Sequence, residues 1–226
     1  MKIDILTLFP NMFDNIINES IIKRALDKKI VEINIHNIRD YSKDPHKKVD
    51  DYGFGGGKGM VLMCQPIFDA VDALKDEDAK VILMTPQGIT YNQQKAYELS
   101  SEKHLIIICG HYEGFDERIR SIVDVEISIG DFVLTGGEIP AMAICDSIVR
   151  LLDGAIDKES HEKDSFNDNL LDYPVYTHPT SFRGMNVPEV LLSGHHANIE
   201  KWRLDEQIKR TKERRPDLLE KRWFYD

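Results

Sequence analysis

Three glycine-containing segments offer the residues best suited to hold a small molecule. They are residues 85–88 (Thr-Pro-Gln-Gly), 110–114 (Gly-His-Tyr-Glu-Gly) and 129–137, and each follows a short apolar run. Glycine has no Cβ atom, so its backbone can come close to a ligand. The segment 129–137 lacks the GxGxxG spacing of a dinucleotide-binding turn. It offers backbone amides, carbonyls and apolar side chains, which suit a purine and a thioether better than a pyrophosphate.

A turn carboxylate and a second run of glycines leave alternatives open. Glu113 lies in the second segment, where it either faces a ligand or is a solvated turn residue. Residues 53–59 (Gly-Phe-Gly-Gly-Gly-Lys-Gly) suggest a phosphate-binding loop. A P-loop needs four residues between its first Gly and its Gly-Lys pair, followed by Ser or Thr, whereas Gly59 follows Lys58 here. The segment is either a mobile or tight turn, or a loop that approaches RNA or an opposing subunit.

Charged residues in the second half of the chain are further candidates, each with a plain alternative. Asp164 lies in the acidic stretch 153–172, which by composition is a charged tether. Arg150 ends a long apolar stretch, where an arginine can also lie at the surface with its stem against apolar residues. From residue 201 to 215, seven basic residues accompany three acidic ones, a local net charge of +4. This run is either a phosphate-binding surface or a solvated helix face.

The bulk composition bounds the class of protein. The 226 residues, 42% of them hydrophobic, suffice for one large domain, alone or with a smaller appendage. The net charge of −10 argues against a non-specific nucleic-acid coat protein, because such proteins neutralise phosphates, but it leaves room for a local basic face. Cys64, Cys109 and Cys145 are odd in number and widely spaced, so no disulfide framework or zinc site is predicted.

The beginning of the chain and the thiols indicate the compartment. Asp4 interrupts the first apolar run, so we predict neither a signal peptide nor a membrane span there. The three cysteines are expected to be reduced, most of them buried. A cytoplasmic protein without a membrane anchor is therefore expected.

Strand-like and helix-like stretches alternate through the first half. Short, mainly apolar stretches predict strands at residues 3–9, 81–84, 105–109 and 123–129, and alternation of apolar and polar residues predicts a half-exposed strand at 31–38. Helical spacing predicts helices at 11–28, 92–100 and 137–152. This order predicts an α/β fold with a mostly parallel sheet covered on both faces. Such sheets bind ligands at the carboxyl ends of their strands, so we expect a small-molecule site where the three glycine-containing turns meet.

The second half divides differently. We predict a first domain over residues 1–155, a flexible acidic linker over 156–172, and a small helical domain over 173–226. The helix of that domain is expected from residue 195 to about 214, ended by Pro216. Trp202 is expected to pack in its core. Disorder is expected around residues 158–163 in the absence of RNA.

Several short motifs, in their number, order and spacing, resemble the bacterial tRNA (guanine-N(1)-)-methyltransferases of the TrmD type. The resemblance runs from Met1 to about Trp223. The matching pieces are Leu6-Thr7-Leu8-Phe9-Pro10, Val49-Asp50-Asp51, residues 55–60, Thr85-Pro86-Gln87-Gly88, Cys109-Gly110-His111-Tyr112-Glu113-Gly114, Ser128-Ile129-Gly130-Asp131, Leu134-Thr135-Gly136-Gly137-Glu138, Asp164-Ser165-Phe166 and Leu191-Leu192-Ser193-Gly194.

The resemblance implies a function, a fold and partners. It implies methyl transfer from S-adenosylmethionine (SAM) to N(1) of the guanosine 3′ of the anticodon in tRNA. The implied fold contains a deep trefoil knot, a rare exception among proteins, and the implied assembly is an obligate homodimer. A magnesium dependence is also implied, with no ligands assigned. The implied SAM-binding residues are Leu83, Thr85, Pro86, Gly110, Tyr112, Glu113, Gly114, Ser128, Ile129, Gly130, Asp131, Phe132, Val133, Leu134, Gly136, Gly137 and Pro140.

The resemblance also assigns the chemistry. Methyl transfer is an in-line displacement, so positioning supplies much of its acceleration. Asp164 would take the proton that leaves N(1), and Arg150 would stabilise the negative charge that builds on the neighbouring carbonyl oxygen. The basic residues expected to contact the RNA are Lys201, Arg203, Lys209, Arg210, Arg214 and Arg215.

Some positions depart from the commonest family pattern. Gly53-Phe54 stands where Pro-Tyr is usual, and Phe132 where Tyr is frequent, which removes a rigid residue and hydroxyl groups. His178 replaces a common Arg, so one positive charge is absent near neutral pH unless the imidazole is protonated. His195 replaces a common Asn.

Two other functions compete with this interpretation. A related knotted methyltransferase acting on ribose hydroxyls would need no carboxylate to remove a ring proton. A nucleotide- or RNA-binding module would perform no catalysis and need not bind SAM. An ordinary Rossmann methyltransferase is disfavoured, because no GxGxG turn follows the first predicted strand.

Overall fold

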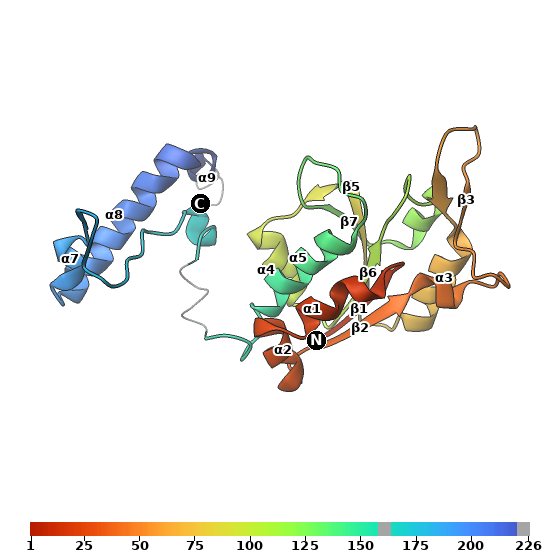
Figure 1. The fold of residues 1–226 in the computed structure, drawn as a ribbon, viewed down its shortest axis with the longest axis horizontal. Coiled ribbons are helices and arrows are strands. Elements are labelled where there is room, and N and C mark those ends of the chain that lie inside the picture. Colours follow the sequence, from red (N-terminus) through yellow and green to blue (C-terminus); the bar gives the residue numbers. More distant parts are fainter. Residues whose placement is uncertain (158–163, 221–226) are drawn as a thin grey trace. The chain divides into compact units, whose positions relative to one another are not determined.

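The strands that carry the three turns are neighbours in one parallel sheet. In the computed structural model, which describes residues 1–157 and 164–220, five strands lie in the order β2-β1-β6-β5-β7 (Figure 1). All neighbouring pairs are parallel. The strands are β1 (Lys2–Thr7), β2 (Glu32–Asn37), β5 (Ala79–Thr90), β6 (His104–Cys109) and β7 (Val125–Ser128). The predicted α/β fold with a mostly parallel sheet is confirmed.

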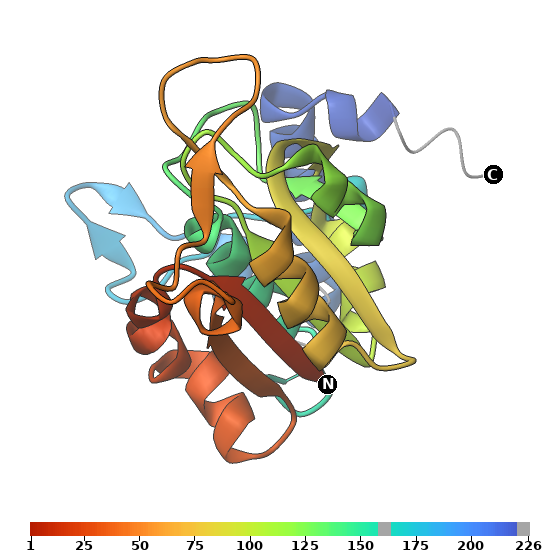
Figure 2. The ribbon, with the colours of Figure 1, turned by 90° about the vertical axis from the view of Figure 1, so that its right-hand side faces the viewer.

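Helices cover both faces of this sheet (Figure 2). On one face α1 (Asp14–Ile17), α2 (Ser20–Asp27), α4 (Gln93–Ser100) and α5 (Glu138–Val149) enclose a core that includes Ile5, Ile82 and Ile107. On the other face α3 (Cys64–Leu74) and the 3-10 helices η2 (Ile38–Tyr41) and η3 (Glu117–Ile122) enclose Leu6, Leu83 and Ile108. Alternate residues of each strand thus enter different cores.

The predicted single helix over residues 11–28 is wrong. The chain forms the 3-10 helix η1 (Pro10–Phe13), then α1 and α2. Glu19 is extended and Ser20 has a left-handed φ of 55°, which no helix can continue. The Asn18 side chain donates to the Asp14 carbonyl oxygen at 2.7 Å and so ends α1.

Two other elements differ from expectation. β5 continues beyond Met84, the predicted end, because the chain rejoins β7 after a register shift between Met84 and Ile89. The glycine run 53–59 connects an antiparallel hairpin, β3 (Asp50–Tyr52) and β4 (Met60–Leu62). Backbone hydrogen bonds from Leu62 to Gly114 and from Glu113 to Met60 join this hairpin to the second turn.

The chain divides into two compact units, Met1–Asp157 and Lys158–Asp226. The second contains α7 (Glu189–Leu192), α8 (His196–Arg214), α9 (Asp217–Glu220) and the hairpin of β8 (Ser181–Phe182) and β9 (Met185–Asn186). The predicted long helix agrees with α8, and Trp202 within it is half-buried. No helix of the described ranges has the length and apolar character needed to cross a bilayer.

Part of the predicted linker is packed within the second unit. The Leu171 amide donates to the Thr211 hydroxyl of α8 at 2.9 Å, and Leu170 is buried. A short 3-10 helix, η4 (Asn167–Asn169), precedes them. The expectation of disorder at residues 158–163 concerns residues outside those that the structure describes.

Candidate functional site

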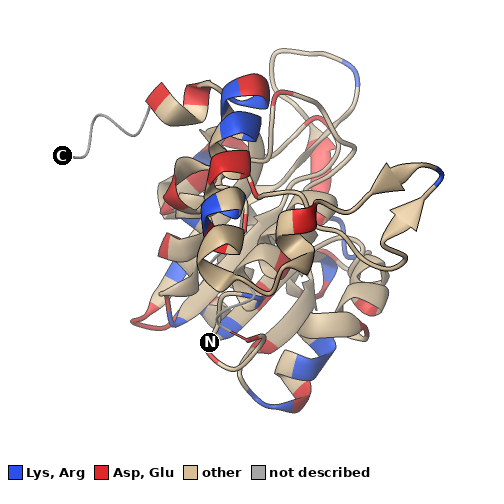
Figure 3. Ribbon diagram, turned by 90° about the vertical axis from the view of Figure 1, so that its left-hand side faces the viewer, with Lys and Arg blue, Asp and Glu red and all other residues tan. Residues whose placement is uncertain are grey.

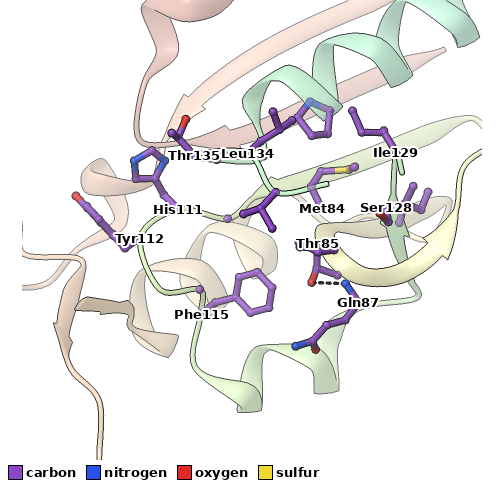
Figure 4. Close-up of a pocket in the computed structure, with 18 of the residues that line it drawn as sticks. Met84, Thr85, Gln87, His111, Tyr112, Phe115, Ser128, Ile129, Leu134 and Thr135 are labelled. Carbon is purple, nitrogen blue, oxygen red and sulfur yellow. Dashed lines mark hydrogen bonds between the residues drawn. The ribbon is translucent and has the colours of Figure 1, made fainter. Parts of the chain in front are cut away.

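A cavity of about 430 Å³ opens where the three glycine-containing turns meet. Its wall includes Thr85 and Gln87 from the first turn, His111 and Tyr112 from the second, and Ile129 from the third (Figure 4). The volume lies in the range of small-molecule sites. The prediction that the three turns come together is confirmed.

The first turn requires a glycine. A Cβ atom at Gly88 would lie 2.4 Å from the carbonyl carbon of Glu126 and from the amide nitrogen of Ile127. Both are backbone atoms of β7, so they have little freedom to move away. The Thr85 hydroxyl accepts a hydrogen bond from the Gln87 amide at 3.3 Å (Figure 4). The turn is therefore held between its own side chain and the neighbouring strand.

The second and third turns cross at close range. The Gly137 amide donates to the Gly110 carbonyl oxygen at 2.8 Å, and His111 forms an isolated bridge with Gly136. A Cβ atom at Gly137 would lie 2.8 Å from the Cα atom of Cys109. These glycines let two loops far apart in sequence share one wall of the cavity.

A buried carboxylate lies behind this crossing. Glu138, at the start of α5, is only 2% exposed and accepts a hydrogen bond from the Thr7 hydroxyl at 2.8 Å. Its other oxygen lies 3.9 Å from His111 Nδ1, a buried atom with no hydrogen-bond partner among the described residues. The His111 ring packs on Phe9, with 4.7 Å between ring centroids. This cluster joins β1, the second turn and α5.

The nearby thiols are not poised for reaction. Cys109 and Cys145 are buried and Cys64 is half-buried, as expected for reduced thiols. Burial raises the pKa of the Cys109 thiol well above its usual value, and the charge of Glu138 acts in the same direction. Burial also raises the pKa of the Cys145 thiol, to about 12. Both groups stay protonated near neutral pH, so neither serves as a nucleophile.

Most residues that the resemblance assigned to SAM line this cavity. The two that do not are Leu83, which is fully buried in the core on the α3 face, and Asp131, which is exposed. The wall also contains residues that the resemblance did not assign to SAM, namely Met84, Gln87, His111, Phe115, Glu117, Arg120, Ile127 and Thr135. Gln87, His111 and Thr135 lie inside the motifs that carry the resemblance, so those motifs could have identified them as cavity residues. Arg120 lies in no such motif.

The two residues assigned to proton removal and charge stabilisation lie in different units. Arg150 directly follows α5 in the first unit and is half-buried. Asp164 is half-buried in the second unit, where its carbonyl oxygen accepts from the Asn167 amide at 3.2 Å. Each has a further interaction in the structure. Their pairing in one active site therefore remains a prediction.

Three of the six basic residues of α8 are paired with acids of their own helix. Lys and Arg alternate with Asp and Glu along it (Figure 3). Lys201 lies 3.5 Å from Asp205, and Lys209 lies 3.9 Å from Glu206. Among the described residues, Arg214 and Lys212 have no ion-pair partner and both are exposed.

The remaining basic residues predicted to meet RNA also have local partners. Arg203 bonds to Glu200 at 2.8 Å and lies over the Tyr173 ring. Arg210 approaches the Asp172 carbonyl oxygen at 3.5 Å. Arg215 pairs with Asp217 at 2.7 Å. Several of the bases predicted to meet RNA are therefore already engaged by neighbouring carboxylates or a carbonyl oxygen.

A metal site has no support from side-chain clusters. In the described part of the chain, no three His, Cys, Asp or Glu side chains lie close enough to hold a metal ion. We therefore assign no residue to the magnesium that the resemblance implies.

Comparisons with known proteins agree on one family. The sequence model described as tRNA (Guanine-1)-methyltransferase TrmD matches residues 1–221. A tRNA (guanine-N(1)-)-methyltransferase of Ruminiclostridium cellulolyticum is 57% identical over 226 residues, covering 98% of this chain and 97% of the relative. Proteins with the same name from Staphylococcus carnosus and Bacillus pumilus are 58% and 56% identical, covering 98% and 100% of this chain and 91% and 98% of the relatives.

Proposed function

The chain belongs to the tRNA (guanine-1)-methyltransferase TrmD family, and from this we propose that it methylates N(1) of the guanosine 3′ of the anticodon in tRNA, with SAM as methyl donor. It is an enzyme of tRNA modification with the SPOUT fold of its family. The observation that carries the proposed site is the cavity where the three turns meet. Its position at the carboxyl ends of parallel strands is the usual ligand position in such folds.

The lining of the cavity fits SAM. Apolar side chains such as Ile129, Leu134 and Pro140 can enclose an adenine ring and a thioether-like chain, and backbone amides of the glycine turns can fix its polar atoms. When bound, SAM supplies a methyl group on a positively charged sulfur. Glu113 on the wall complements that charge, whereas Glu117 is already paired with Arg120.

We assign proton removal and charge stabilisation to Asp164 and Arg150. The carboxylate of Asp164 would accept the proton of guanine N(1). A general base acts within hydrogen-bond reach, so this step requires the carboxylate to approach N(1) to that distance. The Arg150 guanidinium would stabilise the charge that builds on the adjacent carbonyl oxygen. Asp164 belongs to the unit that carries α8. Binding of RNA by that unit would therefore bring the target guanine and the Asp164 carboxylate together.

A homodimer is the assembly that we propose. Apolar side chains are exposed around a second hollow next to the first, lined by Phe9, Met12 and Ile139. Met12 is 46% exposed and Ile139 50%, while Val133 on the nearby third turn is 85% exposed. Exposed apolar patches commonly mark protein interfaces. A second copy covering this patch, in the cytoplasm where tRNA is modified, is consistent with the family.

Methyl transfer to defined transcripts tests the proposal. Labelled SAM is incubated with a tRNA transcript carrying guanosine 3′ of the anticodon, and with a matched transcript carrying adenosine there. Label on the guanosine transcript alone supports both the substrate and the position. Equal label on both transcripts would favour transfer elsewhere, including to a ribose hydroxyl. No label on either, with SAM still bound, would leave a binding module or another RNA substrate.

A further inference from the structure

Arg120 occupies a special position on the cavity wall. Among the described residues it is the only Lys or Arg that lines the cavity. It belongs to η3, outside the three turns, and its side chain is 21% exposed. We propose that Arg120 is a positioning residue of the SAM site, which holds the first and second turns in place through Gln87 and Phe115. This inference rests on the proposed function.

The guanidinium of Arg120 joins three segments of the chain. Its Nε donates to Glu117 within η3 at 2.9 Å, and its Nη2 donates to the side-chain oxygen of Gln87 in the first turn at 2.5 Å. Its Nη1 donates to a carboxylate oxygen of Glu126 on β7. Because the planar fork fixes these donors at set angles, the three partners are held in a defined arrangement.

The same group reaches the second turn through an aromatic ring. The Arg120 guanidinium carbon lies 5.6 Å from the centre of the Phe115 ring. That ring supports the backbone of Gly110, where a Cβ atom would lie 2.9 Å from the ring edge. A shift of Phe115 would therefore move the glycine that begins the second turn.

The contact with Glu126 also supports the packing of the first turn against β7. The backbone of Glu126 is the part of β7 that presses on Gly88, the last residue of the first turn. Arg120 thus hydrogen-bonds both to the Gln87 side chain of this turn and to the strand against which the turn packs. Among the described side chains of the wall, Arg120 alone hydrogen-bonds both to the side chain of Gln87 and to β7.

Charge alone predicts a different behaviour from positioning. SAM carries a net positive charge at neutral pH, whereas its demethylated product, S-adenosylhomocysteine, is neutral overall. Because Arg120→Lys keeps the positive charge beside Glu117 and Glu126, simple Coulomb interaction alone predicts little change in the affinity of either ligand. A positioning role instead predicts that both ligands lose affinity by the same factor.

Arg118 provides a matched control on the same 3-10 helix. It pairs with Asp116 at 2.7 Å, but its side chain is 73% exposed and does not line the cavity. Replacing Arg118 by Lys changes the same chemical group two residues away, without touching Gln87 or Phe115.

The test combines ligand binding with hydrogen exchange. We would compare Arg120→Lys, Gln87→Met and Arg118→Lys by calorimetry with SAM and with S-adenosylhomocysteine. Gln87→Met removes the acceptor in the turn and leaves the two carboxylate partners of Arg120 in place. We expect Arg120→Lys and Gln87→Met to weaken both ligands about ten-fold, as for loss of one strong hydrogen bond, and Arg118→Lys to change them less than about two-fold.

Exchange of the ligand-free protein separates this inference from the proposed function. Amides of residues 87–88 and 110–115 should exchange faster in Arg120→Lys than in the wild type, with those of α4 unchanged. Should the wild-type protein bind no SAM, the proposed function fails, and the exchange result alone decides whether Arg120 positions the turns. Unchanged affinities together with unchanged exchange would overturn the inference, as would a gain in SAM affinity without a matching change for the product.

Discussion

Asp4 forms a buried charged cluster whose removal should destabilise the first unit strongly. Its carboxylate is fully buried and accepts from His36 at 2.8 Å, His104 at 2.7 Å and Asn34 at 3.1 Å, while Lys2 lies at 2.9 Å. Breaking a buried ion pair by removing one partner costs about 3–5 kcal/mol. We expect Asp4→Asn to lower the free energy of unfolding by that amount.

The size of the protein converts this loss into a melting temperature. For chains of 150–250 residues, each kcal/mol shifts Tm by about 2–4 °C, so the expected decrease is about 6–20 °C. Thermal unfolding followed by circular dichroism measures it. Asp78→Asn is the control, because the Asp78–Lys103 pair lies at the surface and is worth at most about 1 kcal/mol.

The effect should also depend on pH in a defined direction. Burial raises the pKa of the Asp4 carboxyl, but hydrogen bonds from His36, Lys2, His104 and Asn34 outweigh it, so the pKa lies well below its usual range. A lowered pKa stabilises the folded state above about pH 4, the ordinary aspartate pKa, and this contribution is lost as pH falls toward the folded-state pKa. The stability difference between wild type and Asp4→Asn should therefore shrink from pH 5 to pH 3. A difference below 1 kcal/mol at neutral pH, or one that does not change with pH, would refute this reasoning.

Three further substitutions test the site and the assembly. Gly88→Ala places a methyl group 2.4 Å from the backbone of β7, so we expect a loss of about 1–3 kcal/mol in stability and weaker SAM binding by calorimetry; normal affinity would show that the turn can relax. Asp164→Ala should retain SAM affinity while methyl transfer falls by about 10²–10⁴-fold in a single-turnover assay, and full activity would remove Asp164 from the mechanism. Ile139→Asp puts a charge on the exposed apolar patch and should convert a dimer to a monomer in sedimentation velocity, whereas an unchanged dimer would place the interface elsewhere.

The elements that the sequence predicted well are those with an unbroken apolar period. The run at residues 105–109 becomes β6, in which every residue is buried, and the stretch 137–152 becomes α5. Periodicity failed where a local hydrogen bond competes with the helix. Residues 11–28 keep helical spacing through Asn18 and Ser20, yet the Asn18 side chain ends α1 there.

Charge counting was a weaker guide to the proposed RNA-binding surface. The acids of α8 lie three or four residues from its bases, as in Lys201–Asp205 and Arg203–Glu200, so they neutralise them on the helix surface. This spacing is visible in the sequence, and it predicts a solvated helix face as well as a phosphate-binding one. Arg214 and Lys212, without an ion-pair partner among the described residues, are the better candidates for phosphate contact.

The cavity shows what motif resemblance transfers and what strand geometry decides. A motif match identifies residues by their position along the chain but does not say which way their side chains point. Side chains of consecutive residues in a strand point to opposite faces of the sheet. Leu83, assigned from the resemblance, faces the core on the α3 side, whereas Met84, which was not assigned, lines the cavity. Any contact of Leu83 with a ligand must therefore run through its backbone, and substitution of its side chain should alter stability before affinity. Arg120 presents the opposite case, because no motif contains it, and only the folding of η3 against β5 and β7 brings its side chain to the turns.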